Sequence, residues 1–502
     1  MNQTRGSSVA AKNENVQVEE QAATLDVSPT LGNVVHSREA TDLPLNGRNL
    51  TQLGLLQLGV APLTFGVLQA GGIKRQGQAF AVNGQAPEAT NYFLDRVTNV
   101  DSVNGGFALR TPPDAVAEFR ILTSNAPAKY GETTGATTTV VTKSGTNAYH
   151  GSLYEVLSNN ALDARNFFAA GTEPLHLNQF GATVGGPVRK DKDFFFAFYE
   201  GQRDSQGETR IAIVPTAAQR LGEFSGIGSP LINEFTGQRF VDEHGNLDRI
   251  PTSRLNPVAL AVEKLILLGN LSPSLFSSTQ NLTNNYDQGG FHLDHYFSNS
   301  DQVFLRYATS SQQVLDPIPI NGSSVPGFPT ADDIRTHSAT ASWVHLFSSR
   351  AVQTARIAFF RNAALVEAAQ NHTPASDLGF TYQPTLPAVT GSPYLIISGY
   401  SNIGNPITGP QNTFQNDYQG YYSFAITRGQ HNLKFGVDAD RQQINALLGI
   451  ATNGFFVFAP FPASDTIASF LLGQPVLFYQ RGGDFTRGLR KWPAECIIGT
   501  AH

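Results

Sequence analysis

The residues of this sequence whose types and spacing suggest chemistry are few, and each also has a plainer structural explanation. The segment His292-Leu293-Asp294-His295 suggests a pair of metal ligands, because its two histidines stand close together in the chain. The segment is expected to be a β-strand, in which residues three apart face opposite sides, so the two histidines could share an ion only across a bulge. We therefore interpret them as polar strand residues and expect no metal site.

Two other groups of residues lead to a similar interpretation. Asp438 and Asp440 share one face of an expected strand, as an acid–base pair would, but polar residues that line a strand-built channel alternate in the same way. Lys143 and Ser144 resemble the last two residues of a phosphate-binding loop. The Gly-x-x-x-x-Gly that must precede them in such a loop is absent, so we do not interpret them as a phosphate site. The sequence also has no G-x-S-x-G, H-E-x-x-H or C-x-x-C motif. We expect no enzyme activity and no cofactor.

The composition indicates an all-β chain with many turns. Of 502 residues, 15% are charged, 47 are Gly and 34 are Phe, whereas soluble domains carry about 25% charged residues. The net charge of −6 gives no reason to expect nucleic acid as a partner, and the single cysteine, Cys496, excludes a disulfide framework. No apolar run reaches the roughly 18 residues of a transmembrane helix, although strands of about 9–11 residues can still cross a membrane.

Residues 138–151 divide the chain into two unlike parts. Residues 138–141 have β-favouring side chains and run into a polar turn, which is made of Thr142, Lys143, Ser144, Gly145, Thr146 and Asn147. Short strands, helices and glycine-rich turns are expected before this turn, and strands of ten or more residues after it. The turn is therefore the expected boundary between two domains.

Before this boundary, the sequence predicts short elements joined by tight turns. Asn46 and Gly47 indicate a turn, and Asn49 can cap the short Leu-rich helix that follows. Asn83 and Gly84 indicate a second turn after a short strand, and another short strand ends at Leu94 and Asp95. Arg96 follows where a glycine would adopt a positive φ more easily, so we expect that turn to be distorted.

After the boundary, pairs of long strands flank short polar turns at residues 299–301, 348–350 and 428–430. Residues 215–286 interrupt this pattern, and we expect a long loop there with one helix that begins at Pro257 and is capped by Asn256. The pattern predicts about ten long strands.

These features resemble the Oar-like branch of TonB-dependent outer-membrane transporters. The resemblance rests on LPLNGRN at residues 43–49, on TKSGTN at residues 142–147, and on NQFG, GGP and FFF-x-x-YEG at residues 178–201. It implies a mainly β protein in which a small α+β plug domain precedes an incomplete antiparallel transmembrane β-barrel. The implied plug signature consists of Leu43, Pro44, Asn46, Gly47, Arg48, Asn83, Gly84, Leu94 and Asp95.

The resemblance also implies domain limits and partners. A flexible segment at 1–30 precedes a plug at 31–146 and a partial barrel at 147–486, and residues 487–502 match nothing. The implied partners are outer-membrane lipid, a TonB-type energy-coupling protein that pairs with a segment containing Val16 and Val18, and an extracellular ligand that could be a siderophore, an oligosaccharide, a peptide or a protein. Plugged transporters have 22 strands. With about ten strands and no apolar signal segment, we expect this chain to be a fragment of such an outer-membrane transporter.

Two alternatives stay open. A surface β-sandwich that acts as an adhesin, binding a partner without transport, would also have many strands and polar turns. Strands of ten or more residues favour the barrel, whereas strands of five or six favour the sandwich. A chain that cannot close its sheet would have no function.

Overall fold

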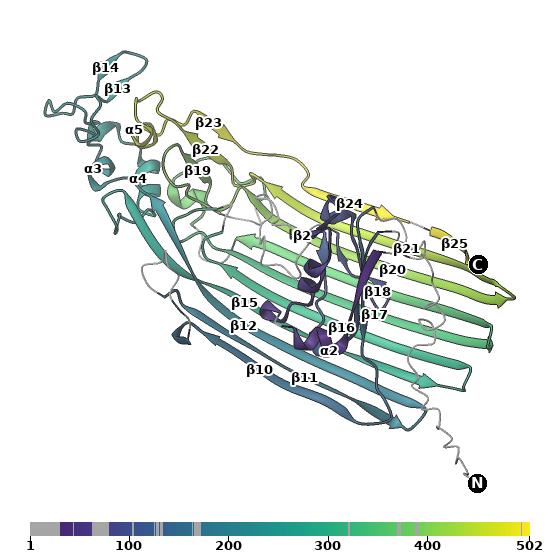
Figure 1. The fold of residues 1–502 in the computed structure, drawn as a ribbon. Coiled ribbons are helices and arrows are strands. Elements are labelled where there is room, and N and C mark those ends of the chain that lie inside the picture. The colour runs from purple at the N-terminus through teal and green to yellow at the C-terminus, as the bar shows by residue number, and fades with distance from the viewer. Residues whose placement is uncertain are drawn as a thin grey trace, which may run out of the picture.

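The computed structural model describes residues 31–43, 45–62, 80–102, 105–124, 126, 130, 134–162, 164, 172–319, 322–368, 373–386, 391–492 and 494–501. In this part of the chain, a small N-terminal sheet lies against one very large antiparallel sheet, and long connections gather at one end of the large sheet (Figure 1). Val16, Val18 and Pro44 lie outside the described residues.

The large sheet follows the order of the chain, with each strand antiparallel to the next. Within the described residues it has ten strand positions, and the last of them is shared by two short strands. The strands are β10 (His150–Asn159), β11 (Leu175–Arg189), β12 (Asp193–Ile213), β15 (Leu275–Tyr296), β16 (Asp301–Asp316), β17 (Thr330–Ser348), β18 (Ala351–Ala368), β20 (Thr408–Arg428), β21 (His431–Ile450), β24 (Thr486–Lys491) and β25 (Ala494–Ala501). Their lengths, up to 22 residues in β15, confirm the prediction of long strands and argue against the sandwich.

One face of the large sheet is polar and the other is apolar, because side chains alternate along each strand. On β17, Thr336 and Ser338 are buried toward the small sheet, and the Thr336 hydroxyl donates to the Ala108 carbonyl there, at 3.3 Å. Ala341 and Trp343 lie on the opposite face, which we call the outer face. Neighbouring strands continue this apolar band with Val303, Leu305, Ala355 and Ile357.

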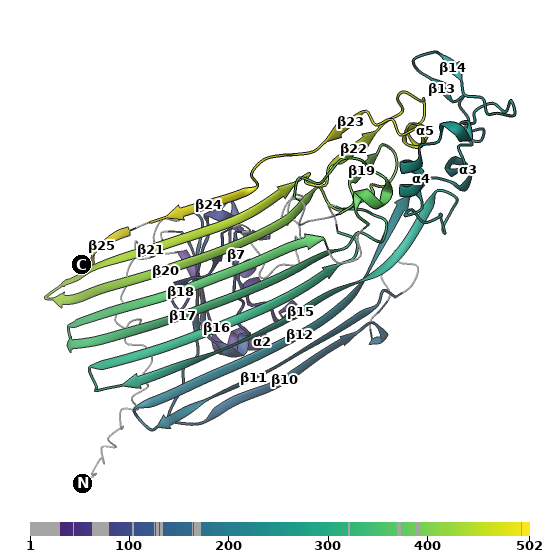
Figure 2. The same cartoon turned by 180° about the vertical axis from the view of Figure 1, so that it is seen from behind.

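The connections differ in length at the two ends of the large sheet, as Figures 1 and 2 show. Short turns join β11 to β12, β15 to β16, β17 to β18 and β20 to β21 at one end. We call this the short-turn end. The three short turns that the sequence predicted are confirmed.

The long connections fold together into a unit that we call the loop unit. Its elements are α3 (Ala217–Arg220), β13 (Ile232–Asn233), β14 (Gln238–Arg239), α4 (Pro257–Glu263), β19 (Tyr394–Ile397), β22 (Phe455–Phe458), α5 (Thr466–Leu471) and β23 (Leu477–Tyr479). Side chains from four connections share one apolar core, in which Phe224, Phe328, Leu395 and Phe470 are buried. The loop unit is therefore a folded structure.

The predicted long loop is present but ends earlier than expected. The Asn256 side chain accepts hydrogen bonds from the backbone of Val258 and Ala259, which confirms the predicted cap of α4. The loop ends at residue 274 and not near 286, because β15 begins at Leu275. Residues 275–286 are rich in Asn and Thr and show little strand pattern, but pairing with the far half of β12 satisfies their backbone groups.

The small sheet has the order β1-β8-β9-β4-β5. Its strands are β1 (Leu31–His36), β4 (Asn91–Leu94), β5 (Val97–Thr98), β8 (Val116–Ser124) and β9 (Thr137–Thr142), and it is accompanied by α2 (Ser37–Asp42), β2 (Val60–Pro62), β3 (Phe80–Val82), β6 (Val100–Asp101) and β7 (Gly106–Phe107). Its core around Phe80, Tyr92 and Phe119 continues into Phe196 and Phe198 of the large sheet. The two sheets therefore share one apolar core where they meet.

The C-terminal segment differs from the sequence-based expectation. Residues 487–502 show no alternation, and no strand was predicted there. In the structure β24 and β25 both pair with β21, through residues 442–447 and 432–439 respectively. Without β24 and β25, the edge of β21 would present unpaired backbone N–H and C=O groups. Pairing with these groups makes the segment extended, although its side chains show no strand pattern.

Candidate functional site

The two sheets are joined by a buried ion pair. The carboxylate of Asp95, at the end of β4, lies 3.0 Å from Nε of Arg306 on β16, and both side chains are almost fully buried. Arg306 also donates to the Leu94 carbonyl at 3.4 Å. Because the pair is removed from water, the loss of either partner would leave an uncompensated charge inside the protein.

The same carboxylate also holds the end of β9. Asp95 accepts hydrogen bonds from the Thr142 backbone at 2.8 Å and from its hydroxyl at 2.9 Å. That hydroxyl lies 3.3 Å from Nδ1 of His292 on β15, and Nε2 of His292 lies 3.4 Å from Asp294. A polar chain thus runs from the small sheet into the large one, and we call it the Asp95 latch.

The two histidines of β15 lie on opposite faces of the strand, as predicted. His292 is buried toward the small sheet, whereas His295 pairs with Asp193 on the outer face. Within the described residues, no three His, Cys, Asp or Glu side chains are arranged to hold a metal ion. His292 therefore serves as a hydrogen-bonding group between the sheets.

A second contact is centred on Arg48. Its guanidinium forms an ion pair with Asp114, lies 4.0 Å from the Glu200 carboxylate on β12, and stacks 4.2 Å over the ring of Tyr154 on β10. The Tyr154 hydroxyl donates to Glu200 at 2.5 Å, and Gln288 donates to its other oxygen at 2.7 Å. We call this group the Arg48 latch.

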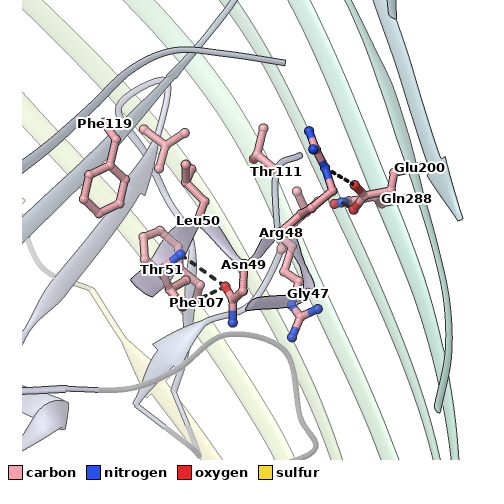
Figure 3. A pocket seen from close by; sticks show the side chains of 13 residues that line it. Gly47, Arg48, Asn49, Leu50, Thr51, Phe107, Thr111, Phe119, Glu200 and Gln288 are labelled. Carbon is pink, nitrogen blue, oxygen red and sulfur yellow. Dashed lines mark hydrogen bonds and ion pairs between the residues drawn. The ribbon is translucent and has the colours of Figure 1, made fainter. Parts of the chain in front are cut away.

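The Arg48 latch borders a cavity of about 20 Å³ between the sheets, which Figure 3 shows with Arg48 and Thr111 on one side and Glu200 and Gln288 on the other. Such a volume holds about one water molecule. Asn49, on its wall, accepts from the Thr51 backbone at 3.1 Å and confirms the predicted cap of the short helix. The interface is thus packed, with room for a water but not for a ligand.

Glutamines of the large sheet make a third contact, with backbone atoms of the small sheet. Gln415 accepts from the Ser102 backbone at 3.0 Å and donates to the Val100 carbonyl at 3.1 Å. Gln419 accepts from the Thr98 backbone at 3.2 Å, and Gln442 donates to the Ser102 hydroxyl at 3.1 Å. These contacts are hydrogen bonds between uncharged groups. Breaking them leaves no buried charge without a partner, so it costs less free energy than breaking the ion pairs.

The predicted boundary turn lies against the short-turn end of the large sheet. A Cβ on Gly145 would lie 2.4 Å from the Phe195 carbonyl, so only glycine fits there. The Asn147 amide donates to Asp191 at 2.5 Å and accepts from its backbone at 2.8 Å, which fastens the turn between β11 and β12. Burial lowers the pKa of Lys143, while the Asp114 carboxylate acts against that shift.

The other predicted residues lie in tight turns, at the ends of elements or in the core. Gly47, Asn83 and Gly84 have positive φ values in tight turns, and Leu94 is buried in the core. Leu43 ends α2 with part of its side chain exposed, and Asn46 lies in the following turn. Asp95 and Arg96 have φ values of 48° and 64°, so Arg96 adopts the positive φ that a glycine would take. The turn keeps its conformation, and the distortion expected at Arg96 was the wrong prediction. Asp438 and Asp440 share the face of β21 from which Gln442 contacts the small sheet.

Comparison with known proteins now identifies the large sheet. The model of the outer membrane beta barrel domain family matches residues 141–496. The chain belongs to this family. Membership confirms the outer-membrane location that the resemblance implied. We call the small sheet in front of the barrel portion, with the elements that accompany it, the plug. The match also extends into the tail that was expected to match nothing.

Individual relatives support the same assignment. The TonB-dependent transporter Oar of Myxococcus xanthus is 29% identical over 136 residues, which are 26% of this chain and 13% of that protein. The outer membrane transporter YddB from Escherichia coli is 9% identical with a TM-score of 0.55, over 93% of this chain and 54% of that chain. A mutant of the ferric enterobactin receptor PfeA from Pseudomonas aeruginosa is 11% identical with a TM-score of 0.50, over 84% and 50%.

The resemblance to Oar-like TonB-dependent transporters is thus confirmed, and the two solved structures confirm the fold. The chain spans about half the length of these structures. The plug of this outer-membrane barrel protein is held by the Asp95 latch, the Arg48 latch and the glutamine contacts.

Sequence reasoning missed one member of the Asp95 latch, Arg306, and three members of the Arg48 latch, Asp114, Tyr154 and Gln288. None of these four residues lies in a local motif, whereas Glu200 lies within FFF-x-x-YEG. An arginine or glutamate at an inward-facing position of a long strand was the available signal. Which plug residue it meets depends on how the plug is seated, and a strand pattern does not contain that information.

Proposed function

We propose that this chain is the plug and part of the barrel of an outer-membrane TonB-dependent transporter, which binds an extracellular ligand and moves it into the periplasm. The observation that carries the proposal is a folded plug seated on the polar face of a sheet whose other face is apolar. A plug in this place blocks passage until it moves. The proposed domains are a plug at 31–146 and a barrel portion at 147–486, after a segment at 1–30.

The contacts between plug and barrel support a mechanism in which another protein supplies the energy that moves the plug. If Asp95 and Arg306 were drawn apart while still shielded from water, each would be an uncompensated buried charge, and removing one partner of such a pair costs about 3–5 kcal/mol. Such a barrier keeps the plug in place at rest. A TonB-type coupling protein would supply the energy by pairing with the segment that contains Val16 and Val18, because an extended segment can add as a strand to another protein.

The loop unit is the proposed place of first contact with the ligand. It lies at the end of the sheet opposite the short turns, and long loops face the exterior in such barrels. Because one neighbour of known structure is a ferric enterobactin receptor, a ferric siderophore is the first ligand class to test. Binding and plug movement require no catalytic group, so we propose no enzymatic role. The adhesin alternative is not favoured, because its sandwich would have short strands.

The test is uptake of radiolabelled ferric siderophores by cells that depend on the full-length protein. We expect uptake to stop when the inner-membrane proton gradient is dissipated. The variant with Val16→Pro and Val18→Pro, which cannot donate backbone hydrogen bonds to a partner strand, should also lose uptake. The matched control, with threonine at both positions, should keep it. Ligand binding that is never followed by gradient-dependent uptake, across siderophores, oligosaccharides and peptides, would contradict the proposal.

A further inference from the structure

The outer face of the barrel portion carries unequal charge at its two ends. Lys190, Lys192, Arg350 and Arg428 are exposed in the turns of the short-turn end. The carboxylates of these turns have other partners: Asp191 is bonded to Asn147, and Asp193 pairs with Arg189 and His295. The short-turn end therefore presents cations whose neighbouring carboxylates are already engaged.

At the opposite end of the outer face, two arginines are paired with carboxylates. Arg203 pairs with Asp287 at 2.9 Å, and Arg335 pairs with Asp333 at 3.0 Å. Both pairs lie beyond the apolar band on the side of the loop unit. An anion approaching Arg203 or Arg335 would have to compete with the carboxylate that is paired with that arginine.

Two similar polar groups mark the border between the apolar band and the short-turn end. His295 pairs with Asp193 and meets the edge of the Phe297 ring at 4.1 Å, and His345 repeats the arrangement with Asp301 and Phe347 at 2.6 Å and 4.4 Å. Trp343 donates its indole N–H to Asp301 at 3.2 Å. Tryptophan with its ring in the apolar band and its N–H at a polar border is typical of the membrane–water interface.

We infer that the short-turn end binds the headgroups of anionic phospholipids, with the phosphodiester at Lys190, Lys192, Arg350 and Arg428 and the acyl chains along the apolar band beside Trp343. The position of these cations indicates which anion they bind. They lie directly beyond an apolar band that membrane lipid covers, so the anions nearest to them are lipid phosphates. Basic residues at a membrane surface attract anionic lipid at about 1 kcal/mol each, or about fivefold. The inference depends on the membrane embedding of the barrel and not on transport.

The test uses Trp343 as the reporter. The chain contains two tryptophans, so Trp492→Phe leaves Trp343 as its single one. The full-length protein, with any further tryptophans also replaced by phenylalanine, is reconstituted in vesicles of phosphatidylcholine that contain a fixed fraction of brominated lipid. Phosphatidylglycerol brominated near the headgroup end of its acyl chains should quench Trp343 several-fold more strongly than phosphatidylcholine brominated in the same way. This preference for phosphatidylglycerol over phosphatidylcholine should weaken as salt is added.

Two variants complete the test. Replacing Lys190, Lys192, Arg350 and Arg428 with serine should reduce the preference to nearly none. Replacing Arg203 and Arg335, at the other end, with serine should leave it unchanged. Equal quenching by both lipids in the parent protein would overturn the inference, and so would an undiminished preference after the four cations are removed.

Discussion

Asp95 in a tight turn of the plug and Arg306 in the middle of a barrel strand meet as a buried ion pair, with Oδ2 and Nε 3.0 Å apart. The turn that presents Asp95 is itself unfavourable, because Asp95 and Arg96 both have positive φ values. The contact with Arg306 and the two hydrogen bonds from Thr142 hold it in that conformation. The plug turn and the barrel wall therefore stabilise one another.

We predict that Asp95→Ala destabilises the seated plug by about 3–5 kcal/mol, because Arg306 is left buried without a counter-charge. Pulse proteolysis of the plug in the reconstituted protein measures the change. Asp333→Ala removes the partner of Arg335 on the exposed face and should cost less than about 1 kcal/mol. In a double-mutant cycle, Arg306→Ala should cost less in the Asp95→Ala background than alone. Additive costs would show that the pair is not coupled.

Gly145 provides a test of the junction between plug and barrel. Gly145→Ala would place a methyl group 2.4 Å from a backbone carbonyl that cannot rotate away. We expect a loss of about 1–3 kcal/mol in folding stability, as for other overpacked sites. Heat-modifiable electrophoretic mobility reports the folded fraction. Gly420→Ala is the control, since nothing lies within 4 Å of the added methyl group. Equal folded fractions of the two variants would refute the close approach of Gly145 to the Phe195 carbonyl.

Tyr92 should make the plug sensitive to alkaline pH. Its side chain is fully buried beside Phe80 and Phe107, and this burial raises its pKa above the ordinary value of 10.0. Above pH 10.0 the unfolded chain therefore binds fewer protons than the folded plug, and folding stability falls as the pH rises further. Tyr92→Phe should remove that part of the pH dependence, as followed by proteolysis of the plug from pH 9 to about 11. Phe107→Leu, which changes the same cluster but no titratable group, should retain it.

The loop unit should unfold separately from the barrel strands. Phe470 is buried and packs edge-on against Phe458 at 5.2 Å, so Phe470→Ala should destabilise the unit by about 3–5 kcal/mol. Limited proteolysis should then cut the loops while the heat-modifiable mobility of the barrel stays normal. Phe235→Ala, at an exposed site, should change loop cleavage little. Loss of barrel mobility in Phe470→Ala would show that the two parts fold as one.

The sequence could predict elements whose cause is local. The cap at Asn256, the turns at Asn83 and Gly84, and the hairpin turns between the long strands each depend on a few neighbouring residues. The alternation of β17 likewise predicts which side chains face inward. These features account for the mainly β fold and for the division of the chain near residue 142.

The sequence could not predict features that depend on distant partners. Residues 275–286 and the strands β24 and β25 have weak patterns of their own, and they are strands because a neighbouring edge pairs with them. The link from Asp95 to Arg306 depends on the seating of one sheet against another. His292 illustrates the same limit, since its strand face was predictable but its contact with Thr142 was not.

Cross-linking the plug to the barrel in living cells tests the central claim most directly. In the full-length protein with Cys496 and any further cysteines replaced by serine, Ser102→Cys and Gln442→Cys place two thiols across a contact of 3.1 Å between the original side chains. A short bis-methanethiosulfonate linker would join them reversibly. The account predicts that ligand uptake stops once the linker has reacted and returns after reduction, whereas each single-cysteine variant is unaffected. Undiminished uptake with the plug fully cross-linked would contradict it.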